Sequence, residues 1–284
     1  MERQEVSSEA WAALGITDVE ELHGGKQARV FAGRRHGLRL VLKLLAARDA
    51  DRSALAARLD MLGALAASDR HVCAPVPLDG RLVNEVVIGD DPVLAVAYEF
   101  VEGREPDLDR AADVVEMGRT LADLHTALAR LPAYELPVVA ALRARADLTL
   151  APTSRTQLLH GDFSAENVRI TAAAMRVFDF DDCGYGPVEF DVANALYVVL
   201  FSATVDGPPG RYGSFRSSFL RGYDERSDRK IDDTTVESLI TARVIALATW
   251  VDDLATAPIG IRNSSKEWIA TLRSFTASYL DTPR

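Results

Sequence analysis

The segment LLHGDFSAENVRITAAAMRVFDFDDCGYGP, residues 158–187, decides the fold class of this chain. Within this segment His160, Asp162, Asn167 and Asp179 appear in that order. Two short apolar runs, residues 168–170 and 176–178, flank a turn and predict a hairpin. The second strand of this hairpin would end at Asp179, so the hairpin is expected to bring Asn167 and Asp179 together.

This order of carboxylates and an amide suits phosphoryl transfer. The reaction needs a carboxylate that accepts or orients the acceptor hydroxyl, and oxygen ligands for the magnesium ions that neutralise the β- and γ-phosphates. In protein kinases a catalytic-loop Asp is followed five positions later by an Asn, and a metal-binding Asp follows a strand. Asp162, Asn167 and Asp179 match that template in order and spacing.

The stretches HGDFSAEN and FDFDDCGYGP resemble the catalytic loop and metal segment of the aminoglycoside phosphotransferase and choline kinase-like family. The Leu-His pair at His125, Asp191 in PVEFDVAN and the RGY at residues 221–223 agree with this resemblance, which extends over nearly the whole chain. It implies an α+β, bilobal protein-kinase-like fold, with a small antiparallel-sheet nucleotide lobe and a larger, mainly helical lobe.

The resemblance also implies a role for each polar residue of the segment. Asp162 would be the catalytic base, Asn167 and Asp179 the magnesium ligands, and His160 a support that holds the catalytic loop. Asp191 would be structural and would hydrogen-bond that loop. The cofactors implied are ATP or GTP together with Mg²⁺.

The first hundred residues predict a small sheet with one helix. Strands are expected at residues 29–32, 38–45, 82–88 and 93–101, because apolar runs there are separated by glycine-rich or Asp-Pro turns. A helix is expected at 50–67, where leucines recur at helical spacing. The composition changes at residues 101–109, so we expect a nucleotide-binding lobe at 1–102 and a catalytic, acceptor-binding lobe at 103–284.

The nucleotide lobe offers several candidate ligands. Lys43 is a lone lysine in an apolar strand and needs an anionic partner, such as the α- and β-phosphates. Gly24 and Gly25 lie in the glycine-containing turn that leads into the strand expected at 29–32, where small residues let backbone N–H groups approach phosphates. Residues 98–103, including Glu99 and Val101, are expected to form a hinge whose backbone meets the base. The helix at 50–67 contains no Glu, so Asp60 is the expected partner of Lys43.

The remaining sequence predicts a mainly helical lobe. Helices are expected at residues 107–131, 134–146, 190–201, 212–222, 235–255 and 265–280, and a loop at 202–213.

Composition argues against several other functions. The formal charge of −10 opposes nucleic-acid binding. The absence of a 20-residue apolar run and of a basic-then-apolar start predicts a cytoplasmic protein without a membrane partner. The two cysteines, Cys73 and Cys183, are expected to be free thiols rather than a disulfide or zinc site.

We therefore expect a Mg²⁺-dependent phosphotransferase that moves the γ-phosphate of ATP or GTP to a hydroxyl group of a small molecule. The resemblance allows an aminoglycoside, another antibiotic, an amino alcohol, a sugar or homoserine as the acceptor, and the net acidity would suit a cationic one. Two alternatives remain open. One is a bacterial Ser/Thr protein kinase of the same superfamily, and the other is a catalytically inactive nucleotide-binding regulatory protein, which the missing helix Glu would explain.

Overall fold

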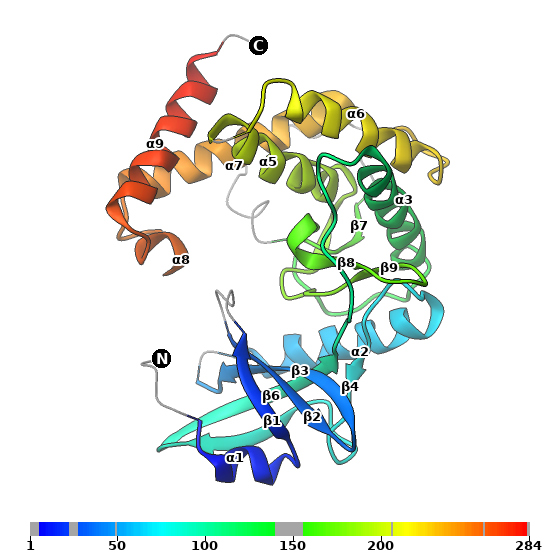
Figure 1. The fold of residues 1–284 in the computed structure, drawn as a ribbon, viewed down its shortest axis with the longest axis vertical. Coiled ribbons are helices and arrows are strands. Elements are labelled where there is room, and N and C mark those ends of the chain that lie inside the picture. Colours follow the sequence, from blue (N-terminus) through cyan, green and yellow to red (C-terminus); the bar gives the residue numbers. More distant parts are fainter. Residues whose placement is uncertain are drawn as a thin grey trace. The chain divides into compact units, whose positions relative to one another are not determined.

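A computed structural model of the chain describes residues 6–22, 28–48, 50–139, 156–205, 207–257 and 259–282 (Figure 1). The chain divides into two compact units. The first contains Met1–Gly103 and Leu131–Glu135, and the second contains Arg104–Arg130 and Leu136–Arg284. The expected roles of the two parts, nucleotide binding and acceptor binding, stay predictions.

The first unit is an antiparallel sheet with two helices. Its elements are α1 (Ser8–Ala13), β1 (Thr17–Leu22), β2 (Arg29–Arg35), β3 (Leu38–Ala46), α2 (Arg52–Ser68), β4 (Pro75–Val76), β5 (Asn84–Ile88) and β6 (Asp91–Glu99). The strand order is β1-β2-β3-β6-β4, and β5 also pairs with β6. The tight β2–β3 turn places His36 and Gly37 at positive φ, which the glycine adopts without strain.

Both faces of this sheet are buried, because alternate residues of β6 pack into different clusters. Val93, Ala95 and Ala97 join a core with β2, β3 and α1, whereas Leu94 and Val96 pack on Leu55 and Leu59 of α2. Lys43 of β3 lies directly opposite Val96 in the register. Since cross-strand neighbours share a face, Lys43 lies on the face of the sheet that α2 covers.

The second unit is mainly helical and carries two small two-stranded sheets. Its elements are α3 (Ala111–Leu128), β7 (Thr156–Leu159), the 3-10 turn η1 (Ala165–Asn167), β8 (Val168–Ile170), β9 (Met175–Val177), β10 (Gly184–Pro187), α5 (Glu189–Val205), α6 (Arg211–Asp224), α7 (Asp233–Asp252), α8 (Ile259–Arg262) and α9 (Lys266–Asp281). In the sheets, β8 pairs with β9 and β7 pairs with β10.

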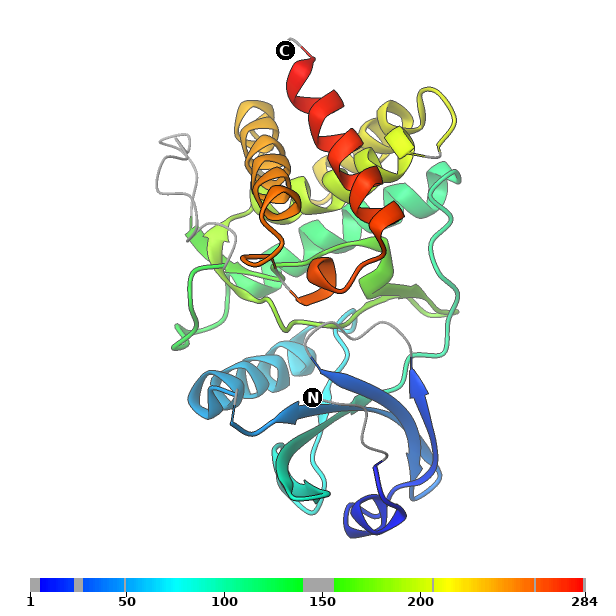
Figure 2. The ribbon, with the colours of Figure 1, turned by 90° about the vertical axis from the view of Figure 1, so that its left-hand side faces the viewer.

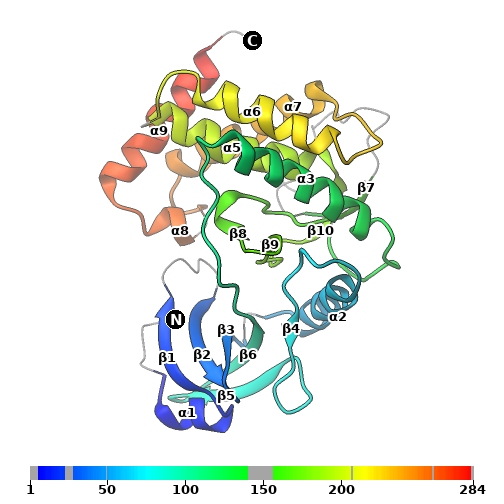
Figure 3. The ribbon, with the colours of Figure 1, turned by 45° about the vertical axis from the view of Figure 1, so that its right-hand side comes forward.

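Two helix contacts organise this unit. The first joins α3 and α6, which lie side by side (Figure 3). Glycines permit their close approach, since a Cβ at Gly222 would lie 2.0 Å from the carbonyl oxygen of Val115. The second contact is made by α7, which packs against α5 and α9; Figure 2 shows α7 in orange beside α9 in red.

Helix α7 is also long and apolar enough to meet the length and composition criteria of a membrane span. Four of its apolar side chains, Val236, Leu239, Ile240 and Val244, are inaccessible or nearly so, and the helix as a whole is partly buried. One such helix is weak evidence of a membrane span, because a core helix of a soluble protein can satisfy the same criteria.

Some sequence expectations were wrong. Residues 134–139 are not helical, because Pro137 interrupts the segment and its carbonyl oxygen accepts from the N–H of Tyr185; residues 140–146 lie outside the described residues. Helix α3 begins at Ala111 rather than at 107, because the Asp113 carboxylate accepts from the N–H of Asp107 and pairs with Arg104, which holds the preceding residues in a turn. The 202–213 loop is shorter than expected, since α5 and α6 extend into it.

Candidate active site

The β8–β9 hairpin positions two of the predicted site residues. Val168 pairs with Val177, and the N–H of Phe178 donates to the carbonyl oxygen of Asn167 at 3.1 Å. Asn167 therefore lies at the start of the hairpin, across from the residue that precedes Asp179. The spacing in the sequence predicts this arrangement.

The carboxylate of Asp162 is held by an amide on each oxygen. Asn167 donates through Nδ2 to Oδ2 at 3.2 Å and to the Asp162 carbonyl oxygen at 2.8 Å. Asn194 of α5 donates through Nδ2 to Oδ1 at 3.1 Å and to the carbonyl oxygen of Phe163 at 3.0 Å. A carboxylate has about four lone-pair positions, so both oxygens can still accept a further hydrogen bond. The carboxylate is thus fixed in orientation yet able to accept a hydroxyl proton.

Asn194 was not among the residues singled out from the sequence. Its side chain is fully buried. The signal that could have found it is an amide in the apolar run FDVANALY, one helical turn after Asp191, because buried polar side chains need a partner.

His160 joins the catalytic loop to the end of the hairpin. Its ring is fully buried, accepts at Nδ1 from the N–H of Asp162 at 3.2 Å, and donates from Nε2 to the carbonyl oxygen of Phe178 at 3.0 Å. The two contacts fix the neutral tautomer with its proton on Nε2. With both nitrogens used in this way, His160 is suited to positioning the loop rather than to proton transfer.

Asp191 holds the backbone of the same loop. It is fully buried and accepts from the N–H groups of His160 at 2.9 Å and Gly161 at 2.8 Å, and it contacts Nε2 of His125 at 3.1 Å. Burial alone would raise the pKa of Asp191, but the hydrogen bonds from His125 and from the Gly161 N–H stabilise the carboxylate, and the pKa lies below its usual value.

The hydrogen bonds that hold the catalytic loop extend from Asp191 through His125 to α6. Nδ1 of His125 lies 2.8 Å from the hydroxyl of Tyr223. Burial raises the pKa of Tyr223, so its hydroxyl keeps its proton and can donate to this nitrogen. Asp191, His125 and Tyr223 therefore form a buried chain of hydrogen bonds beneath the catalytic loop.

Asp179 has an unusual backbone conformation. It follows β9 with φ of 66°, a left-handed conformation that is sparsely populated by non-glycine residues, and its side chain is exposed. The neighbouring Phe180 is buried, and the centroid of its ring lies 4.4 Å from that of the His160 ring. Gly161 also has positive φ, and a Cβ there would lie 2.0 Å from the carbonyl oxygen of Asp182. The two loops are thus packed backbone to backbone.

Asn167 and Asp179 offer oxygen donors, the ligand type that a hard divalent cation prefers. The Nδ2 group of Asn167 is used by Asp162, which leaves the amide oxygen Oδ1 for a ligand. Among the described residues no group of three or more His, Cys, Asp or Glu side chains is arranged around a metal position. A cation here would take Asp179 and Asn167 together with phosphate oxygens, which is the ligand set that Mg²⁺ commonly uses.

The predicted nucleotide ligands of the first unit are placed as follows. Lys43 is 8% exposed and its ammonium lies 5.8 Å from the ring centroid of Tyr98. Asp60 is exposed on the side of α2 away from the buried leucines, so its position gives the expected pairing with Lys43 no support. Gly24 and Gly25 lie outside the described residues.

The expected hinge begins where β6 ends. The N–H of Glu99 donates to the carbonyl oxygen of Ala74 at 3.1 Å, and the N–H of Phe100 donates to that of Arg39 at 3.3 Å. Val101 follows outside any strand and is half-buried. These bonds hold the start of the hinge against neighbouring chain segments, and contact with a base stays a prediction.

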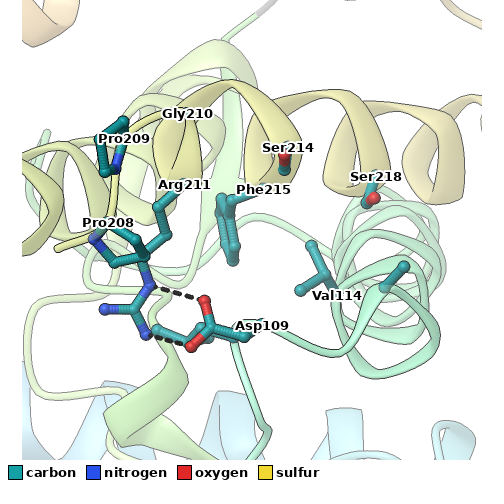
Figure 4. Close-up of a pocket in the computed structure, with 11 residues that line it drawn as sticks. Asp109, Val114, Pro208, Pro209, Gly210, Arg211, Ser214, Phe215 and Ser218 are labelled. Atoms are coloured by element: carbon teal, nitrogen blue, oxygen red, sulfur yellow. Dashed lines mark hydrogen bonds and ion pairs between the residues drawn. The ribbon is translucent and has the colours of Figure 1, made fainter.

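The second unit also has a cavity of about 240 Å³ between the starts of α3 and α6 (Figure 4). Asp109 and Arg211 form an ion pair at one side of it, with Nε of Arg211 2.9 Å from Oδ1 of Asp109. Phe215 lines the cavity and stacks on Phe219, which in turn contacts Phe163 of the catalytic loop. None of the residues predicted to act in catalysis lines it.

Comparison with known proteins bears on the class of this chain. The sequence profile of the phosphotransferase enzyme family matches residues 127–230, which contain the catalytic loop, the hairpin and Asp191. This match confirms the resemblance expected from the sequence and the expected enzyme class, a phosphotransferase. No curated protein matches the sequence at a significant level.

Solved structures confirm the fold. One similar structure is the amicoumacin kinase hAmiN in complex with AMP-PNP, Ca²⁺ and Ami, at 19% identity and a TM-score of 0.75, covering 95% of this chain and 91% of that chain. A microcompartment-associated aminopropanol kinase has 21% identity and a TM-score of 0.71, covering 95% and 94%. Spectinomycin phosphotransferase APH(9)-Ia, in complex with ADP and spectinomycin, has 12% identity and a TM-score of 0.57, covering 94% and 91%. The α+β, protein-kinase-like fold is therefore as expected.

Proposed function

We propose that this phosphotransferase moves the γ-phosphate of ATP or GTP to a hydroxyl group of a small molecule, with Asp162 as the catalytic base. The observation that carries the proposal is the fixation of the Asp162 carboxylate by Asn167 and Asn194, one amide on each oxygen. A hydroxyl that donates to this carboxylate would have its oxygen lone pair directed away from the base, toward an incoming phosphoryl group.

Different residues of the chain would bind the metal, position the catalytic loop and bind the nucleotide. Asn167 and Asp179 would hold Mg²⁺, which when bound neutralises charge on the β- and γ-phosphates. His160 and the Asp191–His125–Tyr223 chain keep the catalytic loop in its conformation. Lys43 would contact the α- and β-phosphates, Gly24 and Gly25 would approach them through their backbone, and the hinge at Glu99 and Val101 would contact the base.

The acceptor is proposed to be a small hydroxyl compound. Amicoumacin, aminopropanol and spectinomycin are the small molecules that the names of the similar structures give, and all three structures are under 25% identical to this chain. A cytoplasmic location and the absence of nucleic-acid and membrane partners stay predictions from the sequence.

One observation favours the inactive alternative. The expected carboxylate partner of Lys43, Asp60, is exposed on the outer side of α2, and this helix has no Glu. Kinases use such a carboxylate to place the lysine. A chain that binds nucleotide but has no acceptor-dependent turnover would fit this alternative.

The test is metal-dependent release of ADP or GDP against a panel of acceptors. The panel contains aminoglycosides, amino alcohols, hydroxy amino acids, sugars and a generic protein. Release that depends on one class of small acceptor supports the proposal, whereas release only with the protein supports the protein-kinase alternative. Nucleotide binding without any release supports the inactive protein.

A further inference from the structure

Helix α5 presents one continuous face to the catalytic loop and to α7. Phe190, Asn194 and Tyr197 lie at positions i, i+4 and i+7 and therefore share one side of the helix. The middle residue of the three, Asn194, donates to the Asp162 carboxylate at 3.1 Å. Any group that covers both rings on this face lies close to the catalytic base.

Arg243 of α7 is such a group. Its guanidinium carbon lies 5.1 Å from the ring centroid of Tyr197 and 5.9 Å from that of Phe190. The positive charge therefore lies over the part of α5 from which Asn194 reaches Asp162. The electrostatics agree, since burial lowers the pKa of Arg243 while the charges of Asp162, Asp182 and Asp191 are among those that raise it.

The guanidinium of Arg243 has N–H donors that can bind a ligand. It has five N–H donors, and its contacts within the described chain are those with the rings of Phe190 and Tyr197. Its nitrogens are also not among the buried atoms that lack a partner, so they are accessible to solvent at the half-buried side chain. A partly desolvated cation in this situation favours an anionic ligand, because ring contacts alone do not satisfy its donors.

The carboxylates of Asp162, Asp179 and Asp182 make this region unfavourable for an anionic acceptor unless a cation compensates them. We propose that the acceptor carries a carboxylate in addition to its hydroxyl, and that Arg243 binds this carboxylate while the hydroxyl lies at Asp162. The planar fork of a guanidinium matches a carboxylate with two parallel hydrogen bonds. This inference rests on the proposed function and narrows its substrate class to hydroxy acids and hydroxy amino acids.

The test compares acceptors that differ only in the carboxylate. L-homoserine is paired with 3-amino-1-propanol, and L-threonine with 1-amino-2-propanol. Each pair is measured with the wild type, with Arg243→Met, which keeps a long apolar side chain, and with Arg243→Lys, which keeps the charge but not the fork. Arg216→Met is the matched control, because Arg216 is also a half-buried arginine that contacts α7, through Asp233.

The wild type should prefer the carboxylate member of a pair. Arg243→Met should lower kcat/KM for that member about 10- to 100-fold through KM, as expected for charge-assisted hydrogen bonds. Arg243→Lys should recover part of this loss. Nucleotide affinity and use of the carboxylate-free acceptor should not change, and Arg216→Met should resemble the wild type.

Two results would overturn the inference. One is an unchanged ratio between the two members of a pair in Arg243→Met. The other is an equal loss of kcat for both members, which would assign Arg243 to the transferred phosphoryl group or to packing. If no acceptor releases ADP, the proposed function fails, and the inference is tested by binding instead. L-homoserine is then titrated into the enzyme with MgADP in a calorimeter. Binding of equal affinity in the wild type and in Arg243→Met would overturn the inference.

Discussion

Asp191→Asn should destabilise the protein strongly although it changes one atom. The Asp191 carboxylate accepts from two backbone N–H groups and contacts His125, in a fully buried position. The asparagine has one acceptor oxygen, and its NH₂ group would face N–H donors. Breaking a buried charged network in this way costs about 3–5 kcal/mol, which for a chain of this size corresponds to a fall in Tm of roughly 10 °C.

The difference between wild type and Asp191→Asn should depend on pH. The folded-state pKa of Asp191 is lowered below its unfolded value, so the carboxylate contributes stability above the unfolded pKa of about 3.9. That contribution is lost as the pH falls through the lower, folded-state pKa. The free-energy difference should therefore stay constant from pH 8 to about pH 5 and shrink below about pH 4.

Urea unfolding followed by circular dichroism between pH 8 and pH 3 measures this difference. Asp109→Asn is the control, because Asp109 forms an exposed ion pair with Arg211, and such pairs contribute about 1 kcal/mol or less. Equal effects of the two substitutions, or an Asp191→Asn difference that grows in acid, would refute the reasoning.

Three further substitutions test other parts of the account. Asn194→Leu removes the donor to Oδ1 of Asp162 and should lower kcat about 10-fold or more while nucleotide affinity, measured by calorimetry, stays the same; unchanged kcat would contradict this role. Asp179→Ala should abolish the dependence of nucleotide affinity on Mg²⁺, and a titration that still shows this dependence would remove Asp179 from the metal site. Gly222→Ala should destabilise by about 1–3 kcal/mol because its Cβ would meet the Val115 carbonyl, whereas Gly213→Ala, which meets nothing within 4 Å, should stabilise by up to about 1 kcal/mol.

Much of the architecture could be predicted because its signals are local. The leucine spacing of α2 and the turn residues between β5 and β6 specify these elements within a few residues of chain. The order of Asp162, Asn167 and Asp179 likewise predicted the hairpin that positions them. The helix expected at 134–146 was wrong over residues 134–139. Short or polar elements such as α1, β4 and β7 were not predicted, since contacts with distant chain segments determine them.

The supporting residues of the site were harder to find for the same reason. Asn194 and Arg243 come from α5 and α7, whose periodicity predicts helices but not which side chain meets the catalytic loop. Both are polar residues in otherwise largely apolar helical runs. Lys43 was predicted as a functional residue because it is a lone cation in an apolar strand, and Arg243, a cation in an apolar helical run, has the same pattern.

The central claim is that Asp162 serves phosphoryl transfer to a hydroxyl. The direct measurement is phosphorus NMR of the reaction of MgATP with the best acceptor of the panel, using wild type and Asp162→Asn at equal nucleotide occupancy. The account predicts a new phosphomonoester signal with the wild type, and formation slower by roughly 10²- to 10⁴-fold in the variant, with nucleotide binding retained. Phosphomonoester formation at the same rate in both proteins would contradict it.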